Sequence, residues 1–140
     1  MRHTNKIELR QGAGSVLDYV IDGRPLLMHL RSRGCKDTDF ISPFGGSCEV
    51  ESRVASWLLL LSKAPFPNGR IPLLVCPRCG DLGCGAVTVA IERVEDCFVW
   101  KDFGFGTPQG ESDTTRYEHV RGFTFMEHDY IDTFRRYLAG

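Results

Sequence analysis

Three of the six cysteines lie close together near the middle of the chain, and their spacing could hold a metal ion. Cys76, Cys79 and Cys84 follow the pattern C-x2-C-x4-C, and a glycine follows the second and the third of them. In the segment Cys-Pro-x-Cys-Gly the two thiolates stand at either end of a tight turn. Proline presets φ there, and glycine tolerates the positive φ that lets backbone N–H groups point at sulfur. Since thiolates are common zinc ligands, the pattern predicts a zinc knuckle.

A structural zinc ion takes four ligands, so this cluster needs one more from elsewhere in the chain. We expect Cys48 or Cys35 to supply it, because three-cysteine sites are usually completed by Cys or His. The predicted metal ligands are therefore Cys76, Cys79, Cys84 and Cys48, and the remaining candidates are Cys35, His29, His119, His128 and Asp81. Cys97 is excluded, because the hairpin predicted below places it roughly 26 Å from Cys84 at a strand rise of ~3.3 Å per residue.

The same cysteines allow other interpretations: reduced thiols without a metal, an iron–sulfur cluster, or a redox dithiol formed by Cys76 and Cys79. A C-x-x-C spacing lowers the pKa of a thiol, which favours redox chemistry. Thioredoxin-like sites, however, place this motif at the start of a helix. Here three glycines and then a predicted strand follow. No other local signature for catalysis accompanies the cysteines, so we expect a protein without enzymatic activity.

Length and composition predict one globular domain spanning residues 1–140. Hydrophobic residues make up 42% of the chain and charged residues 25%, which is ordinary for a globular protein. The net charge of −1, with scattered basic residues, argues against nucleic-acid binding. No apolar run is long enough to cross a membrane, and the first residues lack the apolar core of a secretory signal. We therefore expect a cytoplasmic protein with reduced thiols.

The first half of the chain predicts a strand over residues 7–9, a hairpin and a helix. Asp22 and Gly23 form a favoured two-residue turn between strands over 15–21 and 24–30, so that Tyr19 lies opposite Leu26. Residues 31–46 have no hydrophobic period and predict a loop. Ser47 is the expected N-cap of a helix that runs to about residue 62, with two glutamates in its first turn.

The second half predicts a strand over residues 71–75, a second hairpin and a last helix. Strands over 86–93 and 97–103 alternate between apolar and polar residues, and a turn centred on Val94 and Glu95 pairs Ile91 with Phe98. A long polar loop covers 104–118. A short strand over 123–125 precedes a helix that begins near Glu127. The fold class is α+β, with a mostly antiparallel sheet, two main helices and a cysteine knuckle.

The segment over residues 73–103, with CPRCGDLGCGAVTV and then FVWKDFG, resembles a family of small, uncharacterised bacterial proteins. Its members share a Cys-Pro-x-Cys-Gly-Asp-Leu-Gly-Cys-Gly core followed by a Val-Trp-x-Asp-Phe-Gly-like strand, and residues 123–138 are also similar. The resemblance implies a site at Cys76, Cys79 and Cys84, and the position of Cys97 need not be cysteine in the family. Some members are described as oxidoreductases.

By elimination, these features favour a non-enzymatic domain that binds another protein. An immunity protein that neutralises a bacterial toxin is the most concrete form of this hypothesis. The loops over 31–47 and 110–118 are the expected contact surfaces, and their acidic residues are the expected partner-binding residues: Glu111, Asp113, Asp37 and Asp39. The alternative hypothesis is a thiol-dependent oxidoreductase that uses Cys76 and Cys79.

Overall fold

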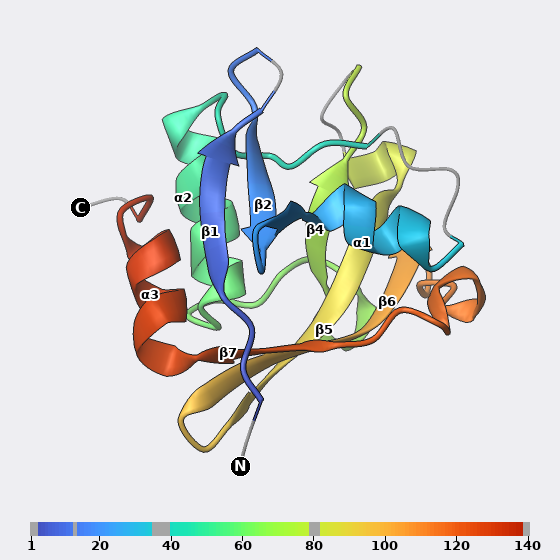
Figure 1. The fold of residues 1–140 in the computed structure, drawn as a ribbon. Helices are drawn as coiled ribbons and strands as arrows, with labels where there is room; N and C mark the ends of the chain where they lie inside the picture. Colours follow the sequence, from blue (N-terminus) through green and yellow to red (C-terminus); the bar gives the residue numbers. More distant parts are fainter. Residues whose placement is uncertain (1–2, 13, 35–39, 79–81, 139–140) are drawn as a thin grey trace.

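The computed structural model describes residues 3–12, 14–34, 40–78 and 82–138, which form two antiparallel sheets and three α-helices. The first sheet has the order β1 (Ile7–Gln11), β2 (Leu17–Ile21) and β3 (Arg24–Pro25), and the second β4 (Ile71–Val75), β5 (Ala86–Val94), β6 (Cys97–Gly106) and β7 (Phe123–Met126). The helices are α1 (Leu26–Ser32), α2 (Cys48–Leu58) and α3 (Glu127–Arg135) (Figure 1). Short 3-10 turns cover Pro67–Gly69 (η1), Leu82–Cys84 (η2) and Thr115–Tyr117 (η3). The predicted α+β class is confirmed.

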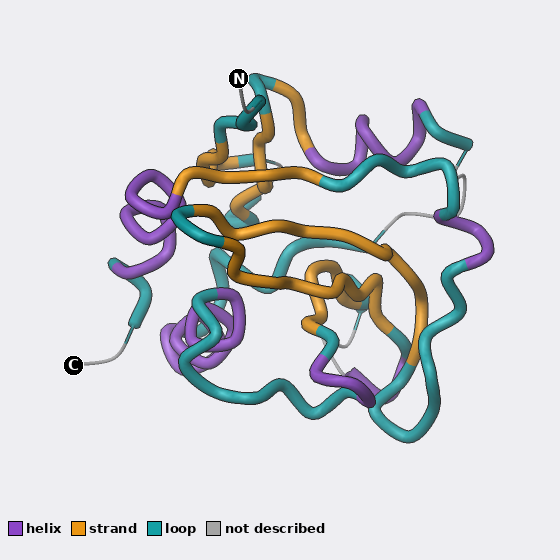
Figure 2. The backbone as a smooth tube through the Cα atoms, turned by 90° about the horizontal axis from the view of Figure 1, so that it is seen from below, coloured by secondary structure: helices purple, strands orange, loops and turns teal. Residues whose placement is uncertain are grey.

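Two backbone contacts join the sheets into one curled surface. At one side Asn5 forms a parallel bridge to Phe125, so the residues before β1 run beside β7. At the other side the segment over residues 41–44 lies between the sheets: Ile41 pairs with Val75, and the Leu17 N–H donates to the Phe44 carbonyl at 3.0 Å. Seen from below, the strands wrap around the interior, and the two longer helices lie together at one side (Figure 2).

Aromatic side chains fill the space between the curled sheet and these two helices. Tyr130 of α3 is fully buried and stacks on Phe98 with ring centroids 4.3 Å apart. Its hydroxyl accepts from Trp100 Nε1 at 3.1 Å and donates to the Leu58 carbonyl at the end of α2 at 2.8 Å. One tyrosine therefore connects the sheet with both helices, and its polar atom is satisfied although it is buried.

The predicted first hairpin is correct up to its second strand and wrong after it. The turn at Asp22 and Gly23 forms, but β3 ends at Pro25 and helix α1 replaces the rest of the expected strand. Proline has no N–H to continue the ladder, and the following residues are good helix formers without a β-branched side chain. Leu26 and Leu30, four positions apart, are both buried. The predicted pairing of Tyr19 with Leu26 is therefore wrong, and Tyr19 pairs with Leu9.

Helix α2 begins as predicted and ends earlier. The Ser47 hydroxyl accepts from the N–H groups of Glu49 at 3.2 Å and Val50 at 3.4 Å, which confirms the N-cap. After Leu58 the chain leaves the helix through Leu60, whose φ of 60° is left-handed. The N–H groups of Leu60 and Leu61 still bond back to the helix, at 3.0 and 2.8 Å. This is the hydrogen-bond pattern of a Schellman C-cap, with leucine where glycine is usual.

The second hairpin forms, but its register differs by two residues from the prediction. The turn lies on Glu95 and Asp96, so Ile91 pairs with Trp100 and not with Phe98. Val94 continues the strand, and Glu95 takes the positive φ of 54°. Because the difference is an even number, the aromatic residues keep the face that was predicted for them. Strands β4 and β7 and helix α3 match their predictions.

Candidate metal centre and its surroundings

Cys76 and Cys84 lie near the two ends of one hairpin connection. Strands β4 and β5 are antiparallel, and Val75 stands opposite Ala86. Cys76 directly follows Val75, and Cys84 precedes Ala86 by two positions; the first is half-buried and the second exposed. Opposite residues of such a pair have Cα atoms about 4.5–5.5 Å apart. The two thiols therefore start from neighbouring points of the backbone.

The third predicted ligand, Cys79, lies outside the described residues, as does Asp81. Within the described ranges, no group of three or more His, Cys, Asp or Glu side chains could hold a metal ion. Cys48, Cys76 and Cys84 therefore form no metal-binding group by themselves, and the three-thiolate site stays a prediction.

The connection between β4 and β5 (residues 76–85), called the cysteine connection below, packs against an aromatic side chain of β6. Gly85 has a φ of +97°, and a Cβ atom placed there would lie 2.5 Å from the Phe105 ring. Glycine is thus required both for the turn and for this close approach. The Phe105 ring also contacts that of Phe40, with centroids 5.5 Å apart. Phe105 therefore contacts both the cysteine connection and Phe40, which directly precedes the segment over residues 41–44 between the two sheets.

The structure places Cys48 on a different side of α2 from the cysteine connection. Val50 and Leu82 of η2 line one hollow, whereas Cys48 lines another together with Arg136 and Tyr137 near the end of α3. Residues two positions apart on a helix point about 200° apart. This placement disfavours Cys48 as the fourth ligand. Cys97 stands opposite Val94 at the far end of β5, in agreement with its exclusion.

The other candidate ligands differ in how they are engaged. Cys35 lies outside the described residues. His29 is half-buried, with Nε2 2.8 Å from the Ile21 carbonyl and its ring 5.2 Å from that of Phe123. His119 and His128 are exposed, and each lies close to a carboxylate. His128 belongs to α3, away from the cysteine connection (Figure 1).

The polar loop over residues 107–114 is held against the end of β6. Phe105 and Asp113 exchange two backbone hydrogen bonds, at 3.0 and 2.8 Å. The Asp113 carboxylate accepts from the Thr115 N–H at 2.9 Å, and this bond lowers the pKa of the carboxyl group. Asp113 thus closes a local turn, and both Asp113 and Glu111 are exposed. The other two predicted partner-binding residues, Asp37 and Asp39, lie outside the described residues.

Beneath this loop lies a buried polar cluster that the sequence analysis missed. Arg70 is only 9% exposed, and its Nε donates to the hydroxyl of the fully buried Thr88 at 3.0 Å. Its Nη2 also donates to the carbonyl of Asp102, a residue in the left-handed region at a bulge of β6. The Thr88 hydroxyl lies 2.8 Å from Ser112 Oγ, so the cluster ties the loop to the sheet. No short-range signal could reveal it, because the partners are 18 to 32 positions apart.

Among the described residues, the C-x-x-C segment is not followed by an α-helix. The next described element is η2, a three-residue 3-10 turn over Leu82–Cys84, and β5 follows it. The helix N-terminus that lowers the thiol pKa in thioredoxin-like proteins is therefore missing from the described residues after the motif. A thioredoxin-like arrangement is therefore not seen in the described residues.

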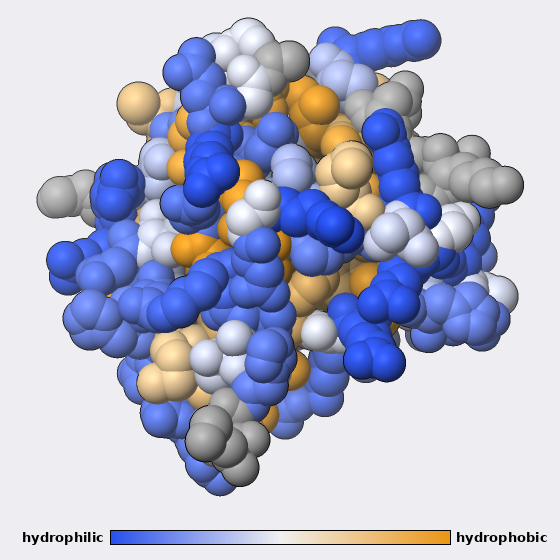
Figure 3. Space-filling view, viewed as in Figure 1, coloured by the Kyte–Doolittle hydropathy of each residue, from blue (hydrophilic) through white to orange (hydrophobic). Residues whose placement is uncertain are grey.

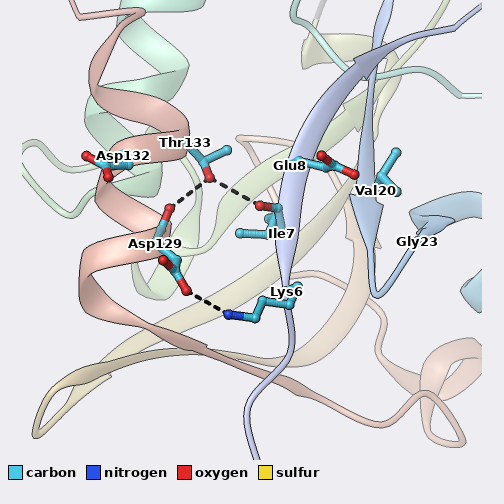
Figure 4. Close-up of a pocket in the computed structure, with 8 residues that line it drawn as sticks. All are labelled: Lys6, Ile7, Glu8, Val20, Gly23, Asp129, Asp132 and Thr133. Atoms are coloured by element: carbon cyan, nitrogen blue, oxygen red, sulfur yellow. Dashed lines mark hydrogen bonds and ion pairs between the residues drawn. The ribbon is translucent and has the colours of Figure 1, made fainter.

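A third hollow, of about 370 Å³, lies between β1 and α3 (Figure 4). Its polar groups already have partners: Lys6 pairs with Asp129 at 3.2 Å, and the Thr133 hydroxyl lies 3.3 Å from the Ile7 carbonyl. No nucleophile faces a general base there among the residues described.

On the face of the molecule seen in Figure 1, hydrophilic side chains cover most of the surface and apolar ones lie scattered among them (Figure 3). No helix in the described parts of the chain is long and apolar enough to span a bilayer.

Comparison of the chain with models of protein families, with curated proteins and with solved structures gave no significant match. The resemblance of the cysteine core to small bacterial proteins therefore stays a prediction.

Proposed function

We propose that the chain is a non-enzymatic protein-binding domain whose cysteine connection is held by a structural zinc ion. The observation that carries this proposal is the pairing of Val75 with Ala86, which brings Cys76 and Cys84 to the two stems of one hairpin. A zinc ion bound by thiolates at about 2.3 Å would cross-link these stems and fix the turn between them. Cys79, between the stems in the sequence, would be the third ligand.

For the fourth ligand we propose Cys35 in preference to Cys48. The N–H and carbonyl of Ile41 both bond to Val75, at 3.0 and 2.7 Å, one residue before Cys76. Ile41, six positions after Cys35, therefore lies directly beside the cysteine connection. The six steps from residue 35 to residue 41 can span up to roughly 20 Å. Cys48, in contrast, lines a hollow with the residues that follow α3.

The partner would bind where three chain segments meet around Phe105. The segment that begins at Phe40, the cysteine connection and the loop over 107–114 all contact this residue or its backbone. Of the predicted acidic contacts, Glu111 is exposed and no structural contact of its side chain is observed within the described residues. Neutralisation of a toxin by an immunity protein is the concrete form of this proposal, since it requires tight binding and no catalysis. The thiolates would need a reducing compartment such as the cytoplasm.

Elemental analysis of gently purified protein tests the metal. We expect about one zinc ion per chain, with the cluster thiols protected from a thiol reagent until the protein unfolds. Cys84→Ser and Cys35→Ser should lose the metal and stability together, whereas Cys48→Ser, the matched control, should keep both. Metal-free protein with a reversible dithiol at Cys76 and Cys79 would refute the zinc site and support a thiol oxidoreductase.

Affinity capture tests the partner. Tagged wild-type protein and Glu111→Lys would be compared in cells that express the genes neighbouring this one. We expect a stoichiometric protein partner that is retained by wild type and reduced by the charge reversal. If wild type retains no protein, the binding proposal is wrong.

A further inference from the structure

We infer that a hollow beside the cysteine connection receives an aliphatic side chain of the partner, while Arg53 binds a carboxylate next to that side chain. This inference rests on the proposed function, because it names what the partner presents. The hollow has a volume of about 80 Å³ and lies between α2, β4 and η2.

Apolar side chains form its walls. Val54 and Trp57 of α2 and Val75 of β4 are buried, at 3%, 7% and 6% exposure. Leu82 closes the side formed by the cysteine connection, and Val50 is 37% exposed. An engineered apolar cavity of ~150 Å³ stays dry and binds benzene. A hollow of about half that size suits a branched alkyl group such as the side chain of Val, Leu or Ile.

Arg53 adds charge to this site and is the one charged side chain among the described residues that line it. Its guanidinium pairs with Glu49 at 3.3 Å, and both side chains are largely exposed. A guanidinium has five N–H donors, and this pair is the one bond of Arg53's guanidinium observed in the described part of the chain. Exposed pairs of this spacing contribute little to stability, so a second carboxylate can share or replace Glu49. A partner lysine would instead lie beside a guanidinium of the same charge.

A random peptide library displayed on phage and selected on immobilised protein tests this chemistry without knowledge of the partner. We expect peptides that combine an aliphatic residue with Asp or Glu one or two positions away. Val50→Glu and Arg53→Glu should each weaken the Kd of a selected peptide at least about tenfold. Replacing the acidic residue of the peptide by lysine should restore binding to Arg53→Glu.

Leu61→Glu is the matched control, because Leu61 is 67% exposed beyond the end of α2 and does not line the hollow. Its Kd should stay within about twofold of wild type, and thermal unfolding would confirm that all three variants fold. Three outcomes would each overturn the inference. They are selected peptides that lack an acidic residue, peptides that bind Val50→Glu as tightly as wild type, and a selection that enriches no peptide at all. If the protein captures a partner in cells but selects no such peptides, this inference is wrong and the proposed function stands. If the protein captures no partner in cells, the proposed function is wrong.

Discussion

The buried cluster around Arg70 makes Thr88→Val an informative substitution, because the side chains of threonine and valine have nearly the same shape. Thr88 is fully buried, and its hydroxyl accepts from the Arg70 guanidinium at 3.0 Å and lies 2.8 Å from Ser112 Oγ. Valine removes this hydroxyl and leaves one N–H of a buried cation without its acceptor. The substitution therefore tests whether the cluster holds the 107–114 loop.

The expected loss of stability combines three contributions. A hydrogen bond to a charged group contributes about 1.5–3 kcal/mol, and the half-buried Ser112 hydroxyl loses a partner at a cost of about 1 kcal/mol. Burial of the added methyl group offsets about 0.8 kcal/mol. The net expectation is about 2–3 kcal/mol, which for a domain of this size corresponds to a decrease in Tm of roughly 6–12 °C.

Urea unfolding and calorimetry would measure this change, and two further variants make it interpretable. Thr124→Val is the control, since Thr124 is a half-buried strand residue whose hydroxyl has no bond described in the structure; we expect a change within about 0.5 kcal/mol. A double-mutant cycle with Ser112→Ala should give a coupling of at least about 0.5 kcal/mol. If Thr88→Val costs no more than its control, the cluster does not carry the stability that we assign to it.

Two further predictions concern the cap of α2 and the loop over 107–114. Leu60→Gly should stabilise the protein by about 0.5–1 kcal/mol in chemical denaturation, because glycine adopts the left-handed conformation without the penalty of a side chain. The same change at Leu61, whose φ is not positive, should not stabilise, and a gain there would contradict this explanation. Asp113→Asn should lower stability at neutral pH. Because the folded pKa of Asp113 lies below its unfolded value of about 3.9, the contribution is present above that value and is lost as pH falls through the folded pKa. Unfolding curves of wild type and variant should therefore converge in acid, and a difference that does not depend on pH would exclude the carboxylate as its cause.

The elements that could be predicted from sequence are those whose signals are local. Ser47 before two glutamates marks a helix start, and α3 shows its apolar stripe within a few turns. Helix α1 was missed because Pro25 ends a strand within a segment that could form either structure. The hairpin register was missed because Glu95, and not a glycine, takes the positive φ.

In the candidate site, too, the sequence could predict only the residues that lie close together in the chain. Cys76, Cys79 and Cys84 are visible as a pattern because they lie within one connection of the chain. The fourth ligand depends on how distant segments pack, and the sequence could not show that Cys48 lies near the residues that follow α3 or that Ile41 lies beside Val75. The buried polar cluster around Arg70 could not be predicted for the same reason.

The bridge between Asn5 and β7 has a consequence for the order of folding. Asn5 and Thr124, which share a hydrogen bond, are 119 positions apart. In an unfolded chain, closing a loop of that length costs about 4 kcal/mol of entropy before any other contact repays it. The N-terminal strand should therefore dock late, after the β5–β6 hairpin and α3 have shortened the effective loop. On a ribosome, the free edge of β6 would stay open until residues 123–126 emerge, which makes this edge the place where an incomplete chain is most prone to wrong pairing.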